Sequence, residues 1–103
     1  MKLKKLKSEL TEILNLEGVD AIFVISEKGE VLIDLSTPKN KDLNPIPLLS
    51  IVKALDNMKE AELIFESKRL WIKNIENNYL VLIANPHTSM AALRLRCDAL
   101  FST

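Results

Sequence analysis

The side chains that most often perform catalysis are rare in this chain, and they do not form a catalytic set. His87 is the only histidine and Cys97 is the only cysteine. A metal site needs several nitrogen, sulfur or carboxylate ligands, and an activated nucleophile needs a base beside it. We therefore interpret His87 as part of a helix start, and Cys97 as a small buried residue on an apolar helical stripe.

Phosphate chemistry has little support in the sequence. Gly18 and Gly29 are the only glycines, so neither a Walker loop nor a dinucleotide-binding fingerprint can be built. Arg94 and Arg96 are candidates for an arginine finger, a residue that stabilises charge during phosphoryl transfer. Both lie in a predicted helix that covers a sheet, where arginine usually faces water. We predict no enzyme activity, no cofactor and no bound metal.

Size and composition limit the classes of protein to consider. The 103 residues predict a single domain spanning 1–103, and 48% apolar residues are enough to build a core. Fourteen basic residues balance fourteen acidic ones, so no overall basic field favours nucleic acid, and a neutral chain does little to oppose self-association. Without a long apolar run or a secretory signal, we expect no membrane span and a cytoplasmic location.

Apolar periodicity predicts three helices and five strands. The first helix covers residues 2–16 and ends near Gly18, which can adopt a left-handed conformation. The last helix follows the helix-start residues 85–89 and runs to about Leu100. The second helix covers 46–60, and its apolar surface is wider than contact with one sheet requires. The predicted strands are 21–25, 31–35, 62–66, 68–76 and 79–84.

The strand patterns predict their places in the sheet. Strands 21–25 and 79–84 are apolar on both faces, so they are expected in the centre. Strand 62–66 alternates glutamate with apolar residues, with Leu63 and Phe65 on the buried face, which is typical of an edge. Gly29 and the pair Asn77–Asn78 are expected to form the two hairpin turns. We predict an α+β fold, an α/β sandwich of topology α-β-β-α-β-β-β-α, with an antiparallel sheet in the order 2-1-5-4-3 and helices on both faces.

This arrangement resembles the Roadblock family, the dynein light-chain type with bacterial and archaeal relatives. The segment ILNLEGVDAIFVISEKGEVL is similar to the opening of that family, and HTSMAALRLRCDAL is similar to its last helix. Where the family often has a glycine near the start of this helix, the chain has Ala91–Ala92. The related longin and profilin-like sheets share part of the strand order.

The resemblance implies a dimer, in which the second helix and the neighbouring edge strand of two copies join two sheets into one. These are the two elements that the residue pattern leaves unsatisfied. The pairing can be with an identical copy or with a paralogue. The expected interface residues are Ile46, Leu49, Lys53, Asp56, Glu62, Ile64 and Glu66.

The resemblance also implies a partner, a small Ras-like GTPase that the protein regulates or scaffolds, and whose hydrolysis some relatives stimulate. A tryptophan on a strand face more often lies in the core. Together, however, Lys68, Arg69, Trp71 and Lys73 form a candidate partner surface, because aromatic and basic residues often anchor protein contacts. The alternative is a small-molecule sensor domain, which would need an internal cavity. The identity of the partner and the pathway stay open.

Overall fold

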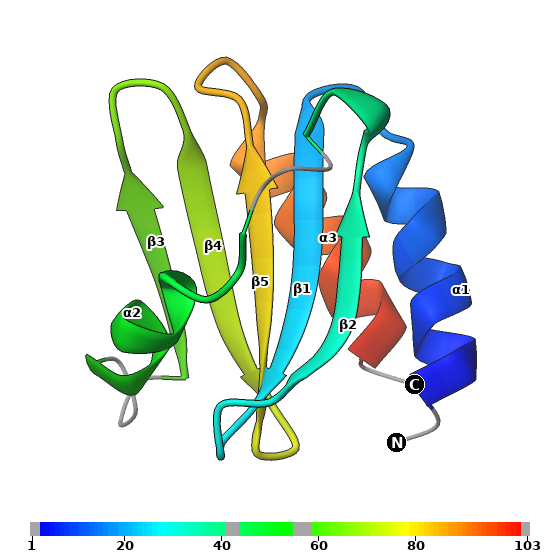
Figure 1. Ribbon diagram of the computed structural model, residues 1–103. Coiled ribbons are helices and arrows are strands. Elements are labelled where there is room, and N and C mark those ends of the chain that lie inside the picture. The colour runs from blue at the N-terminus through cyan, green and yellow to red at the C-terminus, as the bar shows by residue number, and fades with distance from the viewer. Residues whose placement is uncertain (1–2, 41–43, 55–58, 102–103) are drawn as a thin grey trace.

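The computed structural model describes residues 3–40, 44–54 and 59–101. Three α-helices and five strands are arranged as a sheet with helices on both faces (Figure 1). The helices are α1 (Leu3–Leu14), α2 (Leu48–Ala54) and α3 (Met90–Phe101), with a short 3₁₀ helix, η1, at Pro38–Asn40. The strands are β1 (Val19–Ser26), β2 (Val31–Ser36), β3 (Glu60–Ile64), β4 (Arg69–Ile75) and β5 (Asn78–Ala84).

The sheet has the order β2-β1-β5-β4-β3, and every neighbouring pair is antiparallel. The two strands that are apolar on both faces, β1 and β5, lie side by side in the centre, with Phe23 opposite Val81. Each then pairs outward with its hairpin partner, β2 on one side and β4 on the other. The strand order predicted from the sequence is confirmed.

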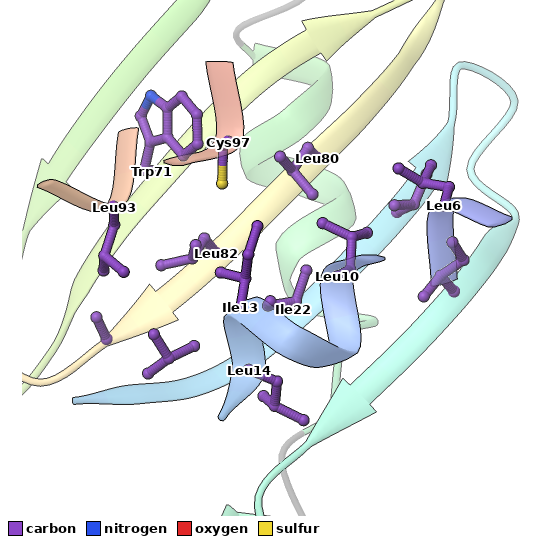
Figure 2. Close-up of a cluster of buried hydrophobic side chains, with 14 of the residues drawn as sticks. Leu6, Leu10, Ile13, Leu14, Ile22, Trp71, Leu80, Leu82, Leu93 and Cys97 are labelled. Carbon is purple, nitrogen blue, oxygen red and sulfur yellow. The ribbon is translucent and has the colours of Figure 1, made fainter. Parts of the chain in front are cut away.

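Two apolar clusters hold the helices to the sheet. The first lies between the sheet and the α1–α3 layer, where Leu10, Ile22, Trp71 and Cys97 are completely buried (Figure 2). The second lies on the opposite face, where α2 crosses in front of β3 and β4 (Figure 1). It combines Leu48 and Val52 of α2 with buried residues of the sheet, which are Ala21, Phe23, Ile25, Leu70, Ile72, Tyr79, Val81 and Ile83. The double-sided apolar pattern of the central strands follows from these two layers.

The second hairpin turn lies one residue earlier than predicted. Glu76 and Asn77 both have positive φ angles, 49° and 68°, and together they connect Ile75 to Asn78. Positive φ at both central residues is the signature of a type I′ turn, which suits the twist of a hairpin. The sequence signal from adjacent asparagines was correct in kind, but Asn78 belongs to the strand.

The predicted bounds around the second helix and the edge strand are wrong. The described part of α2 ends at Ala54, and β3 begins at Glu60, so Glu60 is not helical. The strand also ends earlier, because the Phe65 amide donates to the Lys68 carbonyl (2.9 Å) and closes the hairpin around residues 66–67. Glu66 therefore lies in a turn and not on the strand. Residues 55–58, which belong to the predicted second helix, lie outside the described residues.

None of the helices in the described part of the chain has the length and apolar character required to span a bilayer.

Candidate functional site

The outer strand β3 is the candidate site, because it forms one end of the sheet. Among the described strands, β3 pairs only with β4. The amide of Phe65 donates to the carbonyl of Lys68 (2.9 Å), and the amide of Asn74 donates to the carbonyl of Lys59 (2.8 Å). These bonds show that the odd-numbered residues of β3 direct their backbone groups toward β4.

The even-numbered residues must therefore direct their backbone groups away from the sheet, since direction alternates along a strand. Glu60, Glu62 and Ile64 are these residues, and we call them the edge residues. Their amides and carbonyls form a row suited to pairing with another strand. In β3 the sequence places glutamates on the edge, and charged side chains at a sheet edge discourage indiscriminate pairing.

Apolar side chains are exposed along the same margin. Ile64 is 70% exposed and Phe65 is 48% exposed, although the alternating pattern predicted Phe65 on the buried face. Phe65 follows the end of β3, where the chain turns away from the layer that covers Leu63. On the α2 side, Ile46 is 63% exposed. Isolated exposed apolar residues are common, but two adjacent ones at the end of an edge strand, Ile64 and Phe65, favour an interaction surface.

The expected dimer-interface residues fall into four groups. Ile46, Lys53, Glu62 and Ile64 are exposed, as an interface residue of a free protomer should be. Leu49 is half-buried and packs against the cluster beneath α2, so part of its apolar surface is already covered within the chain. Glu66 lies in the hairpin turn, and Asp56 lies outside the described residues.

The candidate partner surface built on Trp71 needs correction. Trp71 is 0% exposed and packs with Leu93 and Cys97 of α3 (Figure 2), so it cannot present its ring to a partner. Lys68 forms an ion pair with Asp20 (2.6 Å), and Lys73 forms one with Asp98. Trp71 lies on the opposite face of β4 from Leu70 and Ile72, which belong to the cluster beneath α2. The helix that covers Trp71 is contributed by a distant part of the chain.

Ion pairs connect the edge of the sheet to the α3 layer. Arg94 pairs with Glu60 of β3, and Asp98 pairs with Lys73 of β4. Arg94 and Asp98 are four residues apart, so they lie on the same side of the helix. Arg94 is therefore committed to a contact within the chain, whereas Arg96 is exposed. Glu60, the residue that anchors this contact, was expected in the second helix and was missed as an edge residue.

The two residues singled out for chemistry lie apart from the edge. His87 is exposed in the turn before α3, where its amide donates to the Asn85 side chain (2.9 Å). Cys97 is buried, and burial, with a smaller contribution from Asp98, raises the pKa of its thiol to about 12. A protonated thiol is a poor nucleophile. In the described part of the chain, no three potential ligands gather around a metal site.

Two hollows bear on the alternative of a ligand-binding domain. One of about 320 Å³ is lined by polar residues around the start of α3, namely Glu17, Gly18, Asn85, His87, Thr88 and Ser89. The other, of about 20 Å³, lies beside α2 and has room for roughly one water molecule. Small-molecule sites are mostly apolar and enclosed. The larger hollow is polar, and the smaller one, although partly apolar, is too small for a ligand of more than a few atoms.

Comparison with known proteins gives a consistent fold assignment. No family model matches the sequence. No curated protein matches it either. A solved structure of MglB in a tetrameric arrangement matches with a TM-score of 0.79 and 17% identity, over 97% of this chain and 85% of that chain. The Roadblock/LC7 domain from Streptomyces avermitilis matches with a TM-score of 0.73 and 18% identity, over 94% of this chain and 95% of that domain.

A profilin complex matches as well. A chain in the complex of LokiProfilin2 with rabbit actin has a TM-score of 0.68 and 19% identity, over 93% of this chain and 91% of that chain. These identities are too low to carry function, but the coverage is nearly complete in both directions. The likeness therefore extends to the whole sheet with its helices, as the sequence resemblance predicted. The chain has the Roadblock/LC7 fold, an architecture that profilin-like proteins share in part.

Proposed function

We propose that this protein is a non-catalytic dimeric interaction module that regulates or scaffolds a small Ras-like GTPase. The observation that carries the proposal is the open β3 edge with its outward backbone groups and exposed apolar neighbours. Two copies that pair along this edge would satisfy backbone groups and cover Ile64 and Phe65 at the same time. The Roadblock/LC7 fold supports this mode of assembly.

The GTPase partner rests on the family resemblance. MglB and a Roadblock/LC7 domain are among the structural neighbours. The resemblance to the Roadblock family implies a small GTPase as the partner. The protein would act on its partner through a surface and not through a reaction of its own. Because Arg94 is held by Glu60, we expect any stimulation of hydrolysis to arise from repositioning of loops in the GTPase.

The sensor alternative has weaker support. It requires an internal cavity, and the central strands fill the space between the helical layers with bulky residues such as Phe23, Leu80 and Leu82, all 0% exposed. The larger hollow is polar and includes the exposed residues Glu17, His87 and Ser89. A reproducible increase in Tm with a metabolite would favour the sensor.

Dimer formation can be tested with a proline in the edge strand. Proline lacks the backbone N–H, and the Glu62 N–H points away from β4, so Glu62→Pro removes an outward donor but no bond of the β3–β4 ladder. Light scattering should give the wild type twice the chain mass of 11.6 kDa and Glu62→Pro the single mass. Glu62→Ala keeps the N–H and should remain dimeric.

The fold of each variant is checked by the emission of the single tryptophan, Trp71, which is buried. A wild type that is monomeric at tens of micromolar would contradict the proposed dimer. A folded Glu62→Pro variant that remains dimeric would show that the dimer interface does not include this edge.

The partner is tested by affinity capture from the native source, followed by mass spectrometry. The wild type is expected to retain a small GTPase, and the monomeric Glu62→Pro variant is expected to retain less of it. The purified GTPase is then assayed for GTP hydrolysis with and without the protein. A faster rate indicates an activator, an unchanged rate with a stable complex indicates a scaffold, and retention of no GTPase contradicts the proposal.

A further inference from the structure

The geometry of β3 points to a specific register: we infer that two copies pair their β3 strands antiparallel with the two-fold axis passing through Glu62. This inference rests on the proposed dimer and adds where the axis lies. It follows from which residues face outward, from the charges beside them, and from the length of the strand.

The hydrogen-bonding pattern of the edge favours this axis. The outward-facing backbone groups belong to Glu60, Glu62 and Ile64, which are spaced symmetrically about Glu62. Antiparallel strands exchange two hydrogen bonds at each pair of residues whose backbone groups face each other. With the axis at Glu62, Glu62 lies opposite its own counterpart, and Glu60 lies opposite Ile64 of the second copy.

Every other two-fold register leaves one edge residue without a counterpart among the three. An axis at Leu63 pairs Glu62 with Ile64 but moves Glu60 opposite Glu66, which lies in the turn. An axis at Ala61 pairs Glu60 with Glu62 and leaves Ile64 and Phe65 near the end of the contact. Among the residues of β3 that the structure describes, the register centred on Glu62 therefore forms the longest ladder.

This register brings the two Glu62 carboxylates to face each other across the axis. Directly opposed like charges destabilise a strand pair, but only modestly. On β4, Glu62 lies opposite Trp71, so Arg69 and Lys73 flank it diagonally on the same face. Glu60, the other acid of the contact, is already paired with Arg94. Arg69 reduces the repulsion, whereas Lys73 is already paired with Asp98. The repulsion that remains is modest, and the register gains backbone hydrogen bonds that oppose it.

The side chains fit the same register. On the α2 face, Ala61 lies opposite Leu63 of the second copy, so two half-buried apolar residues from each protomer complete one apolar surface. On the α3 face, the exposed Ile64 lies opposite the Glu60–Arg94 pair of the second copy, where it can pack on the methylene stem of Arg94. The dimer axis then coincides with a carboxylate pair beside two basic residues.

The position of the axis can be tested by introducing one cysteine at a time into β3. Glu62→Cys, Leu63→Cys and Ala61→Cys are each oxidised in the full chain, with the wild type as a control for Cys97, which is buried. A residue on the axis lies about 5.5 Å from its counterpart between Cα atoms, within disulfide range, whereas a residue one position away lies at about 7–8 Å. Glu62→Cys is expected to give the covalent dimer, and the other two variants are expected to give little.

Affinity measurements provide a second readout. Glu62→Gln removes the like-charge pair and should lower the dimer Kd by about 1.5- to 5-fold, whereas the matched variant Glu66→Gln in the turn should change it little. A preferred cross-link at Leu63 or Ala61, or a Glu62→Gln variant with unchanged affinity, overturns the axis while the dimer itself stands. A monomeric wild type overturns both. A dimer that no variant cross-links places the contact away from β3.

Discussion

Arg94 of α3 forms an ion pair with Glu60 of β3, so the open edge of the sheet is attached to the helix layer by residues that are far apart in sequence. Both side chains are partly exposed, and pairs of this kind typically contribute about 0.2–1 kcal/mol. A double-mutant cycle with Glu60→Gln and Arg94→Met should give a coupling free energy of unfolding in this range. A coupling free energy of zero in low salt would show that the pair has no role in positioning β3.

Gly18 is expected to tolerate substitution less well than Gly29. Both have positive φ angles near 90°, but a Cβ atom on Gly18 would lie 2.0 Å from the Thr88 hydroxyl oxygen, whereas one on Gly29 meets nothing within 4 Å. Gly29→Ala should lower the free energy of unfolding by about 1–2 kcal/mol, from the backbone conformation alone. Gly18→Ala should lower the free energy of unfolding by about 1–3 kcal/mol more than Gly29→Ala does, because of the steric conflict.

Denaturant unfolding of the two glycine variants measures this difference. Thr88→Ala provides the control, because it removes the conflicting atom and should recover part of the loss in a Gly18→Ala background. Equal destabilisation by the two glycine variants would contradict the close contact.

The exposed Ile46 provides a cleaner test of the α2 side of the interface than Leu49 does. Leu49→Asp would place a charge against the cluster beneath α2, so it would destabilise the fold as well as any dimer. Ile46→Asp should weaken the dimer by at least several-fold while the Tm measured at low concentration stays within a few degrees. Sedimentation equilibrium measures the dimer Kd. An unchanged dimer would show that Ile46 remains solvent-exposed in the assembly.

Burial of Cys97 predicts a specific dependence of stability on pH. Its thiol pKa is raised from 9.0 to about 12 in the folded protein, mainly by burial. The folded state therefore holds the proton more tightly than the unfolded state does. This contribution to stability is complete below pH 9 and is lost progressively as the pH rises from 9 toward 12.

Lysine and tyrosine residues titrate in the same pH range, but they do so in both the wild type and the Cys97→Ala variant. The difference in stability between the two proteins therefore isolates the contribution of Cys97. The stability difference between wild type and variant should narrow as the pH rises from 8 to 10.5. A thiol reagent at pH 8 should react with native Cys97 only as fast as the protein opens. Rapid labelling of the folded protein would contradict the buried position.

Local sequence patterns determined most of the architecture. Strands apolar on both faces have to be central, because only a sheet covered on both sides can bury them, and this fixed the positions of β1 and β5. The glutamate–apolar alternation identified β3 as an edge, and glycines and asparagines located the turns to within one residue. These features depend on neighbours that are close in sequence, or on the total apolar content of one segment.

Tertiary contacts decided the details of the site. Trp71 is buried because α3 covers it, and Glu60 is fixed because Arg94 reaches it, so neither fact is encoded in the residues around β3 and β4. The hairpin bond from Phe65 to Lys68 shortened the strand and set which backbone groups face outward. A sequence specifies which face of a strand is apolar. Only the packing of distant segments decides which apolar and charged groups remain at the surface for a partner.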